Sequence, residues 1–289
     1  MNMRIIPRLD IKGPNLVKGI HFEGLRVLGK PEDFARYYYE NGADELIYMD
    51  AVASLYGRNS LLDIVEKTSR EIFIPLTVGG GLRSVEDIRT VLRAGADKVS
   101  LNTAAIARPE LIREAAHAFG SSTIVVSIEA IRKPNGAYEA HVDYGRQGTD
   151  VDAIEWAMRV VELGAGELVV TSINKEGAGK GFDLDLSRKI AQAVPIPVIA
   201  GGGAGRVRDV YDVITQGQAD AVCLASILHY DYIKHHRELV DDYSQEGNTE
   251  FLRKGVGFSN IQPATIREIK EYLSSQGVDC RPVLESIGV

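Results

Sequence analysis

An internal repeat constrains the fold of this chain more than any other feature of its sequence. Residues 77–84, TVGGGLRS, return in closely similar form as residues 199–206, IAGGGAGR, and a short apolar run opened by proline precedes each copy. The same number of residues separates Gly79 from Gly201 and Glu45 from Glu167. The sequence therefore predicts two copies of one structural half.

Short apolar segments alternate with amphipathic ones along the whole chain. Strands are expected at 4–9, 45–50, 73–78, 97–101, 123–128, 167–172, 197–200 and 220–224, and such apolar runs are typical of parallel strands buried on both faces. Helices are expected at 31–42, 59–70, 84–94, 108–119, 152–164, 184–193, 206–217 and 263–275. This order predicts an α/β fold, a (β/α)8 TIM barrel built from two half-barrel repeats, as one domain over residues 1–289. An open doubly wound sheet would not explain two equivalent glycine turns.

Composition narrows the class of protein. A net charge of -7 argues against a broad nucleic-acid surface. The N-terminus lacks a signal peptide and no apolar run is long enough to span a membrane, so a cytoplasmic protein without membrane contact is expected. Cys223 and Cys280 form no disulfide or metal pattern, and His235 and His236 have no partner ligands in sequence, so neither a metal nor a cofactor is expected.

Active sites of such barrels lie at the carboxyl ends of the strands. Two acids, Asp10 and Glu129, occupy these ends on the first and fifth strands, opposite each other. Such a pair can divide the roles of catalytic acid and base. Either residue could instead be a strand-end cap or a salt-bridge partner.

The glycine turns predict two phosphate sites, because glycine lets the backbone approach an anion and the following helix offers free N–H groups. The first site would use Gly81, Asn102 and Thr103, and the second Gly177, Gly202, Gly203, Ala225 and Ser226, where a short extra helix is expected. Asp50, Thr171 and Glu176 are further candidates for substrate contact at the strand ends. Opposed sites predict a small-molecule substrate with a phosphate at each end. A single glycine turn is also compatible with an ordinary tight loop.

Two long connections interrupt the alternation. Residues 11–30 form an unusually long connection after the first strand, which predicts a lid whose Lys18 meets substrate charge; the alternative is a solvated surface loop. Residues 230–262 are expected to be a surface insertion before the last helix.

The opposite ends of the strands carry alternating charges. Arg4, Glu45, Lys98 and Glu167 would form a ring at the floor of the barrel, with Asp97 beside it on a possible partner-facing surface. Such a ring is usually a stability device, although it could also act as a gate.

The segments IIPRLDIK, LVKG, GADEL, TVGGG, RAGADKVSLNTAA, GAGE, GGAG and ASILH resemble, in order, those of the cyclase subunit of imidazole glycerol phosphate synthase. The resemblance covers nearly all of residues 3–229. It implies a heterodimer with a glutaminase subunit on the N-terminal face of the barrel, which releases ammonia into it. It also implies a gate formed by the floor ring, a partner-facing Asp97, a lid lysine at Lys18 and an essential aspartate at Asp10. Ammonia and a bisphosphorylated ribulosyl formimino carboxamide ribotide would give imidazole glycerol phosphate and aminoimidazole carboxamide ribotide.

The departures from that family cluster at the mouth of the barrel. Glu129 replaces the second essential aspartate, Asn174 and Glu176 replace aspartates, Ala178 replaces threonine and Gly201 replaces serine. The chain could therefore be a working cyclase. It could also be a diverged paralogue that delivers ammonia to another substrate, such as a sugar amidinated for a surface polysaccharide, or a non-catalytic subunit that activates the glutaminase. A phosphosugar isomerase of the related half-barrel type is disfavoured because it would leave the floor residues without a purpose beyond packing.

Overall fold

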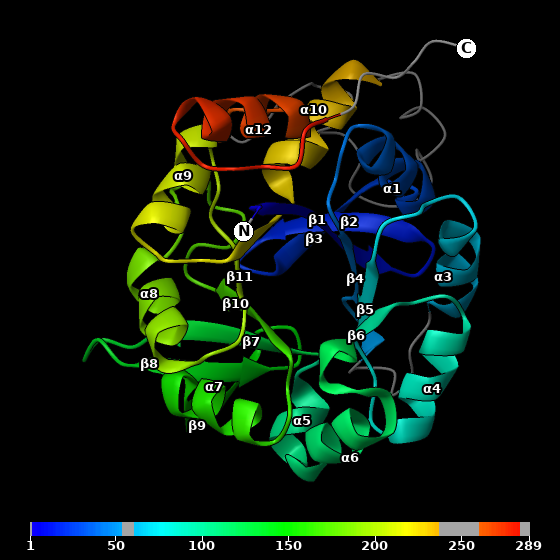
Figure 1. Cartoon of the computed structure of the whole chain (residues 1–289), viewed down its shortest axis with the longest axis vertical. Coiled ribbons are helices and arrows are strands. Elements are labelled where there is room, and N and C mark those ends of the chain that lie inside the picture. Colours follow the sequence, from blue (N-terminus) through cyan, green and yellow to red (C-terminus); the bar gives the residue numbers. More distant parts are fainter. Residues whose placement is uncertain (1, 54–60, 237–259, 284–289) are drawn as a thin grey trace.

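A computed structural model describes residues 2–53, 61–236 and 260–283. Eight parallel strands close into a barrel, and helices surround it (Figure 1). In order around the barrel the strands are β1 (Arg4–Lys12), β4 (Leu46–Asp50), β5 (Leu76–Gly79), β6 (Lys98–Leu101), β7 (Ile124–Arg132), β10 (Glu167–Ser172), β11 (Val198–Gly201) and β12 (Ala221–Leu224). Pairing of Arg4 with Ala221 joins β1 to β12 and completes the closure. The expected barrel is thus confirmed.

The outer layer holds the helices expected from the sequence. They are α1 (Pro31–Glu40), α3 (Leu62–Ser69), α4 (Val85–Arg93), α6 (Glu110–Phe119), α7 (Ala153–Glu162), α8 (Leu184–Ala193), α9 (Val207–Thr215) and α12 (Ile266–Ser275). Their boundaries follow ordinary capping rules, since the Ser84 side chain accepts a hydrogen bond from Asp87 N and begins α4, and Asp152 caps α7 in the same way. A short 3₁₀ turn, η1 (Ser121–Thr123), leads into β7.

Two further helices follow β6 and β12 directly. They are α5 (Thr103–Ala107) and α10 (Ser226–His235), and their N-cap residues, Asn102 and Ala225, share nearly the same unusual backbone, with ψ of -87° and -85°. Helix α10 is the extra helix expected at Ser226, and it runs into the stretch that was expected to be an insertion. Most of that stretch, residues 237–259, lies outside the described residues.

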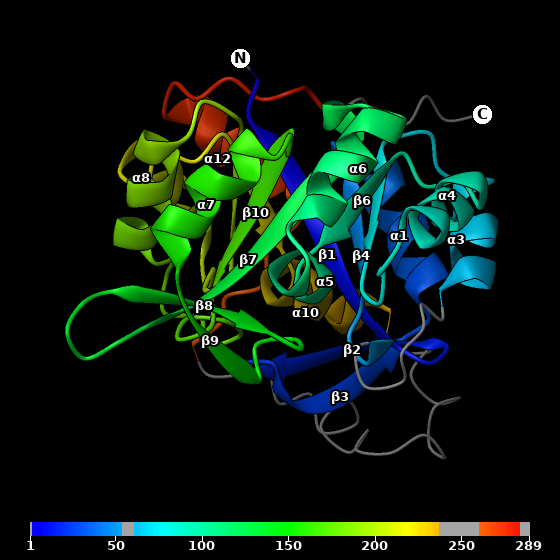
Figure 2. The same ribbon diagram turned by 90° about the horizontal axis from the view of Figure 1, so that it is seen from below.

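The long connection at residues 11–30 is a β-hairpin with buried residues, so the alternative of a solvated surface loop was wrong. Strand β1 continues to Lys12, and β2 (Asn15–Ile20) and β3 (Glu23–Gly29) return along it as an antiparallel hairpin. A second hairpin, β8 (Tyr138–Val142) and β9 (Gln147–Asp152), follows β7 and was not expected. The boundaries were missed because β1 and β7 continue past their apolar runs into polar residues. Both hairpins lie at one end of the barrel, and the N-terminus lies at the other (Figure 2).

The barrel interior is layered along each strand, because alternate side chains point inward. On β1 the inward sequence is Arg4, Ile6, Arg8 and Asp10, while Ile5 and its outward neighbours pack against the helices. The middle layer is an apolar cluster of Ile6, Ile47, Met49, Val125, Val169, Ile199, Ala221 and Cys223. The interior thus joins two polar ends through an apolar middle. Among the described residues, no helix has the length and apolar character to cross a membrane.

Candidate active site

Asp10 and Glu129 both lie at the mouth of the barrel, as their positions at strand ends predicted. Each side chain is about 99% buried, since only 1% of either residue is exposed. Their strands, β1 and β7, are separated by three strands on either side of the ring, so the two acids face each other across the barrel. The Arg8 side chain lies between the two carboxyl groups.

Arg8 joins these two acids, although no motif in the sequence marked it as a site residue. Its Nε donates to Asp10 Oδ1 at 2.9 Å, its Nη1 donates to Thr171 Oγ1 at 3.3 Å, and its Nη2 lies 3.8 Å from Glu129 Oε1. Burial is the largest single effect and disfavours the charged guanidinium, but Asp10, Glu129 and the other acidic groups nearby together outweigh it and raise the pKa of Arg8 further above its usual range. The signal in the sequence was a basic residue at an inward position, one layer below Asp10, in an otherwise apolar strand.

Glu129 is tuned by its surroundings toward the neutral acid. Burial raises the pKa of Glu129 to about 7, although the charge of Arg8 opposes the shift. Asn102 Nδ2 donates to Glu129 Oε2 at 3.2 Å and to the His141 carbonyl at 3.2 Å, which fixes the side chain. Near neutral pH this carboxyl group can therefore both donate and accept a proton.

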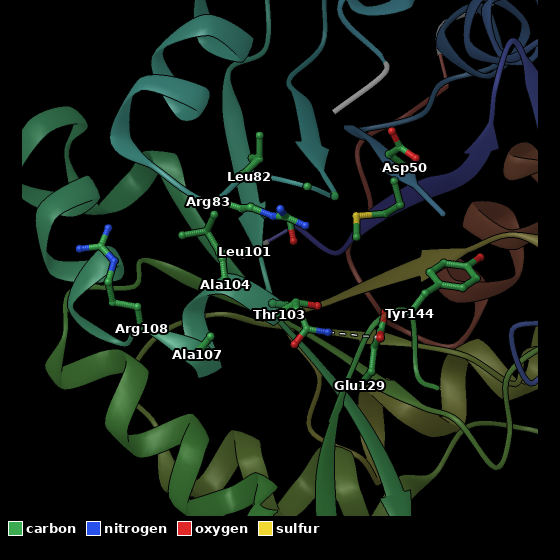
Figure 3. Close-up of a pocket in the computed structure, with 15 residues that line it drawn as sticks. Asp50, Leu82, Arg83, Leu101, Thr103, Ala104, Ala107, Arg108, Glu129 and Tyr144 are labelled. Atoms are coloured by element: carbon green, nitrogen blue, oxygen red, sulfur yellow. Dashed lines mark hydrogen bonds between the residues drawn. The ribbon is translucent and has the colours of Figure 1, made fainter. Parts of the chain in front are cut away.

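The first predicted phosphate site opens into a cavity of about 340 Å³. Its walls come from the ends of β4, β5, β6 and β7 and from the start of α5 (Figure 3). Among the predicted residues it includes Asp50, Gly81, Asn102, Thr103 and Glu129. Gly80 and Gly81 have φ of 96° and 70°, which only glycine adopts readily. The Asp50 side chain is fixed separately, because its Oδ1 accepts a hydrogen bond from Val52 N at 3.1 Å. The geometry gathers these residues around a space large enough for a small ligand.

Arg83 and Arg108 also line this cavity, and the sequence analysis did not identify them. Arg83 directly follows the glycine turn, and Arg108 follows α5, where it forms an ion pair with Glu114 at 2.7 Å. Thr103 Oγ1 accepts from Asp143 N at 3.0 Å, which leaves its O–H free to donate. The cavity thus combines cations and backbone turns, as an anion site requires.

The residues of the second predicted phosphate site lie together, but the chain's own side chains occupy most of the space between them. Gly177, Gly202, Gly203, Ala225 and Ser226 come together around a cavity of only about 20 Å³, the space of about one water molecule. The carboxylate of Glu176 forms an ion pair with Lys18 Nζ here, and both residues are buried. A phosphate entering this site must displace the Glu176 carboxylate from Lys18.

The β2–β3 hairpin closes the mouth from above. Phe22 at its tip packs against Tyr144 of the opposite hairpin, with ring centroids 4.4 Å apart, and the Arg8 guanidinium lies 5.2 Å from the centre of the Phe22 ring. His21 Nδ1 lies 2.6 Å from the Ile173 carbonyl oxygen beyond β10. Burial, followed by the charge of Asp10, raises the pKa of Tyr144 far above its usual value. The segment expected to be a lid thus covers the two acids as an ordered hairpin.

His229 contacts the backbone of Arg8 at the mouth of the barrel. This fully buried residue of α10 lies with Nδ1 2.6 Å from the Tyr38 hydroxyl and with Nε2 3.1 Å from the Arg8 carbonyl oxygen. Burial lowers the pKa of His229 to about 3, so its ring is neutral and one nitrogen can donate while the other accepts. The ring therefore fixes the backbone of Arg8 through a donated hydrogen bond.

The four charged residues predicted at the floor form a closed ring. Arg4 contacts Glu45 at 2.6 Å and Glu167 at 2.5 Å, and Lys98 contacts the same two acids at 2.9 Å and 3.1 Å. All four carboxylate oxygens are paired, and the two cations are about one-fifth exposed. The ring lies below the apolar middle layer, at the end of the barrel opposite to Asp10.

Asp97 lies beside the ring and has a local structural role. Its Oδ2 accepts from Leu76 N at 2.9 Å, and Asp44 and Asp220 make the same bond to Ile5 N and Val198 N. Each aspartate fixes the start of a neighbouring strand. Asp97 is also exposed, which leaves it available on the outer surface of this end.

Comparison with known proteins gives one consistent result. The family described as histidine biosynthesis protein matches residues 4–234. A Legionella pneumophila protein named imidazole glycerol phosphate synthase subunit HisF is 56% identical over 208 residues, which cover 72% of this chain and 98% of that protein. A protein of the same name from Alkaliphilus metalliredigens (strain QYMF) is 48% identical over 230 residues, which cover 80% of this chain and 91% of that protein.

Proposed function

Because the chain belongs to the histidine biosynthesis protein family, together with the HisF subunits, we propose that it is the cyclase subunit of an imidazole glycerol phosphate synthase. In this reaction ammonia and a bisphosphorylated ribulosyl formimino carboxamide ribotide give imidazole glycerol phosphate and aminoimidazole carboxamide ribotide. The observation that carries the proposal is the pair of buried acids, Asp10 and Glu129, on opposite strands at the mouth of the barrel, with Arg8 2.9 Å from the first and 3.8 Å from the second.

The two acids differ in environment, which suits them to different proton transfers. The Asp10 carboxylate pairs with the Arg8 guanidinium at 2.9 Å, and it can accept a proton from the attacking nitrogen. Glu129 has a pKa of about 7 and donates a proton to the oxygen that leaves. Ring closure and cleavage each need one group that takes a proton and one that gives it. Asp10 and Glu129 supply both.

The ammonia would come from a glutaminase subunit bound at the floor. The ring of Arg4, Glu45, Lys98 and Glu167 would be the gate, and Asp97 would face the partner. Above the ring, the apolar layer that contains Ile6 and Val169 favours neutral ammonia over ammonium, because an apolar medium penalises charge. A heterodimer would thus deliver ammonia from beneath the two acids.

The substrate phosphates would bind on either side of the acids. The first would lie at Gly81, Asn102 and Thr103, beside Arg83. The second would lie at Gly177, Gly202, Gly203, Ala225 and Ser226, with Thr171 nearby, and would take Lys18 as its counterion in place of Glu176.

One observation favours a second candidate function. The second site is filled by the chain's own carboxylate, and Glu129 carries one methylene more than the aspartate of the resembling family. A displacement of about 1 Å in a catalytic group can cost about 100-fold. The second candidate is a diverged subunit that delivers glutaminase-derived ammonia to another substrate, such as a sugar, or that only activates the glutaminase.

The two candidates separate in one assay. Purified chain is mixed with an ammonium salt and the bisphosphate, and substrate and both products are followed by mass spectrometry. The cyclase consumes the bisphosphate and releases both products in equal amounts. Inertness toward the bisphosphate, together with stimulation of a glutaminase partner, would select the second candidate.

A further inference from the structure

Arg8 has a hydrogen-bonding capacity that the fold does not use. Its Nε and Nη1 are bonded to Asp10 and Thr171, but its buried Nη2 has no hydrogen-bond partner among the described residues. The nearest acceptor on that side, Glu129 Oε1, is 3.8 Å away, which is too far for a hydrogen bond. A buried charged donor without a partner is costly, and such a group in a native structure calls for an explanation.

Among the described residues, the surroundings of Arg8 offer this donor an ion pair with Glu129 but no hydrogen bond. The side chain of Arg8 is only 6% exposed, and the Phe22 ring covers its guanidinium. Its backbone is fixed separately, through the His229 ring at 3.1 Å. A shorter cation on β1 could also balance the negative charge of Asp10. The planar guanidinium of arginine does more, because it holds Asp10 with one edge and leaves Nη2 directed between the two acids.

We infer that Arg8 is a further catalytic residue, whose Nη2 binds and polarises the carbonyl oxygen of the substrate at the carbon that ammonia attacks. This inference rests on the proposed function for the presence of that carbonyl, the ketone of the ribulosyl group. The oxygen would lie to one side of the line that joins Arg8 Nη2 to Glu129 Oε1, within hydrogen-bond distance of both atoms, which are 3.8 Å apart.

The addition step balances with the groups at the mouth. The lone pair of the ammonia nitrogen forms the C–N bond, and the π pair of the C=O bond moves onto oxygen. Arg8 Nη2 donates to the developing oxyanion, and Glu129, as the neutral acid, transfers its proton to that oxygen. Asp10 takes the proton that the nitrogen loses. The product is a carbinolamine, and no oxidant, reductant or metal is required.

Removal of the guanidinium should lower turnover more than substrate binding. Loss of one preorganised donor to an oxyanion typically costs about 100-fold to 1,000-fold in kcat. Arg8→Ala is therefore expected to lose at least about 100-fold in ammonium-driven kcat with little change in KM, measured with the bisphosphate. Guanidinium chloride at millimolar concentration should restore part of the kcat of Arg8→Ala, because the deleted side chain leaves space for it.

Two further variants separate catalysis from folding. Arg8→Lys keeps the positive charge beside Asp10 but cannot hold Asp10 and the substrate oxygen together, so its kcat should fall by about 10-fold or more. Lys270→Met is the matched control, because Lys270 is a buried cation paired to Asp44 at 2.9 Å, away from the mouth. It should lose stability and keep the wild-type kcat.

The outcomes of these experiments distinguish a failure of the role assigned to Arg8 from a failure of the proposed function. If the wild-type chain turns over the bisphosphate while Arg8→Lys keeps full kcat, or while folded Arg8→Ala gains nothing from guanidinium, the role assigned to Arg8 is wrong and the proposed function stands. If the wild-type chain itself is inert, the proposed function fails and takes this inference with it.

Discussion

Both ends of the barrel carry networks of charged side chains. The network at the floor is fully paired, whereas the network at the mouth is not. At the floor, two cations and two acids form a closed ring in which all four carboxylate oxygens are paired, and solvent reaches the cations. At the mouth, Arg8 bonds Asp10 but leaves Nη2 unbonded beside Glu129, and all three residues are buried. A completed network has no capacity left for a ligand, whereas an incomplete buried one does. In the proposed function, the floor serves stability and passage and the mouth carries the chemistry.

The largest effect is expected from removing the base at the mouth. Asp10→Asn keeps the size of the side chain but cannot take a proton, and it no longer balances Arg8. Ammonium-driven kcat should fall by about 1,000-fold, within the range of about 100-fold to 10,000-fold for general bases. A variant with more than a tenth of wild-type kcat would show that the mouth is not the catalytic end.

Glu129 should set the alkaline limit of activity. Its pKa of about 7 means that the proton is present below pH 7 and absent above it. If Glu129 acts as the acid, kcat/KM of the wild-type chain for the bisphosphate, measured at a fixed concentration of neutral ammonia, should decline above about pH 7. Glu129→Gln should lose about 100-fold in kcat and also lose that decline. A profile that stays flat from pH 6 to 9 in the wild-type chain would remove Glu129 from the proton transfer.

An effect of intermediate size is expected on phosphate binding at the second predicted phosphate site, where Glu176 pairs with Lys18. Glu176→Gln keeps the shape of the side chain and removes the charge that competes with phosphate for Lys18. Calorimetric titration with inorganic phosphate should show this site binding about 10-fold more tightly than in the wild-type chain, about 1.4 kcal/mol. Glu139→Gln is the control, because Glu139 pairs with Lys133 in the β8–β9 hairpin, away from this site. Equal phosphate binding by wild type and Glu176→Gln would show that Glu176 does not occupy the phosphate position.

The smallest effect is expected at the floor. Arg4→Met breaks two ion pairs, but Lys98 still contacts both acids and solvent reaches the site. Unfolding free energy should fall by about 1 to 2 kcal/mol, less than the 3 to 5 kcal/mol typical of fully buried pairs. Ammonium-driven kcat should stay within about 3-fold of wild type, whereas glutamine-driven turnover with a glutaminase partner should fall further. A loss of ammonium-driven kcat equal to that of Asp10→Asn would erase the distinction between the two ends.

The sequence predicted the scaffold well because the scaffold depends on periodic burial. Eight apolar runs and their intervening amphipathic segments specify the strands and helices, and the expected bounds of helix α8 match the structure. The hairpins could not be predicted in this way, since β2 and β3 mix polar and apolar residues and are held by β1 and by contacts such as Phe22 with Tyr144.

The residues of the candidate site also divide into those that the sequence could predict and those that it could not. Asp10 and Glu129 could be located because they end apolar strands, and the floor ring because its charges start them. Arg8 could not be assigned a partner from sequence, because its contacts come from β1, β7 and β10 at once. The ion pair of Lys18 with Glu176 likewise joins two segments far apart in the chain, so the filling of the second phosphate site appears only in three dimensions.

The central claim is that the mouth of this barrel joins ammonia to its substrate. The most direct test supplies ¹⁵N-labelled ammonium and the bisphosphate to the purified chain, and follows the label by mass spectrometry. The claim predicts one ¹⁵N atom in the imidazole product and none in the carboxamide ribotide released with it. Product without label, or no product at all from the folded chain, would contradict it.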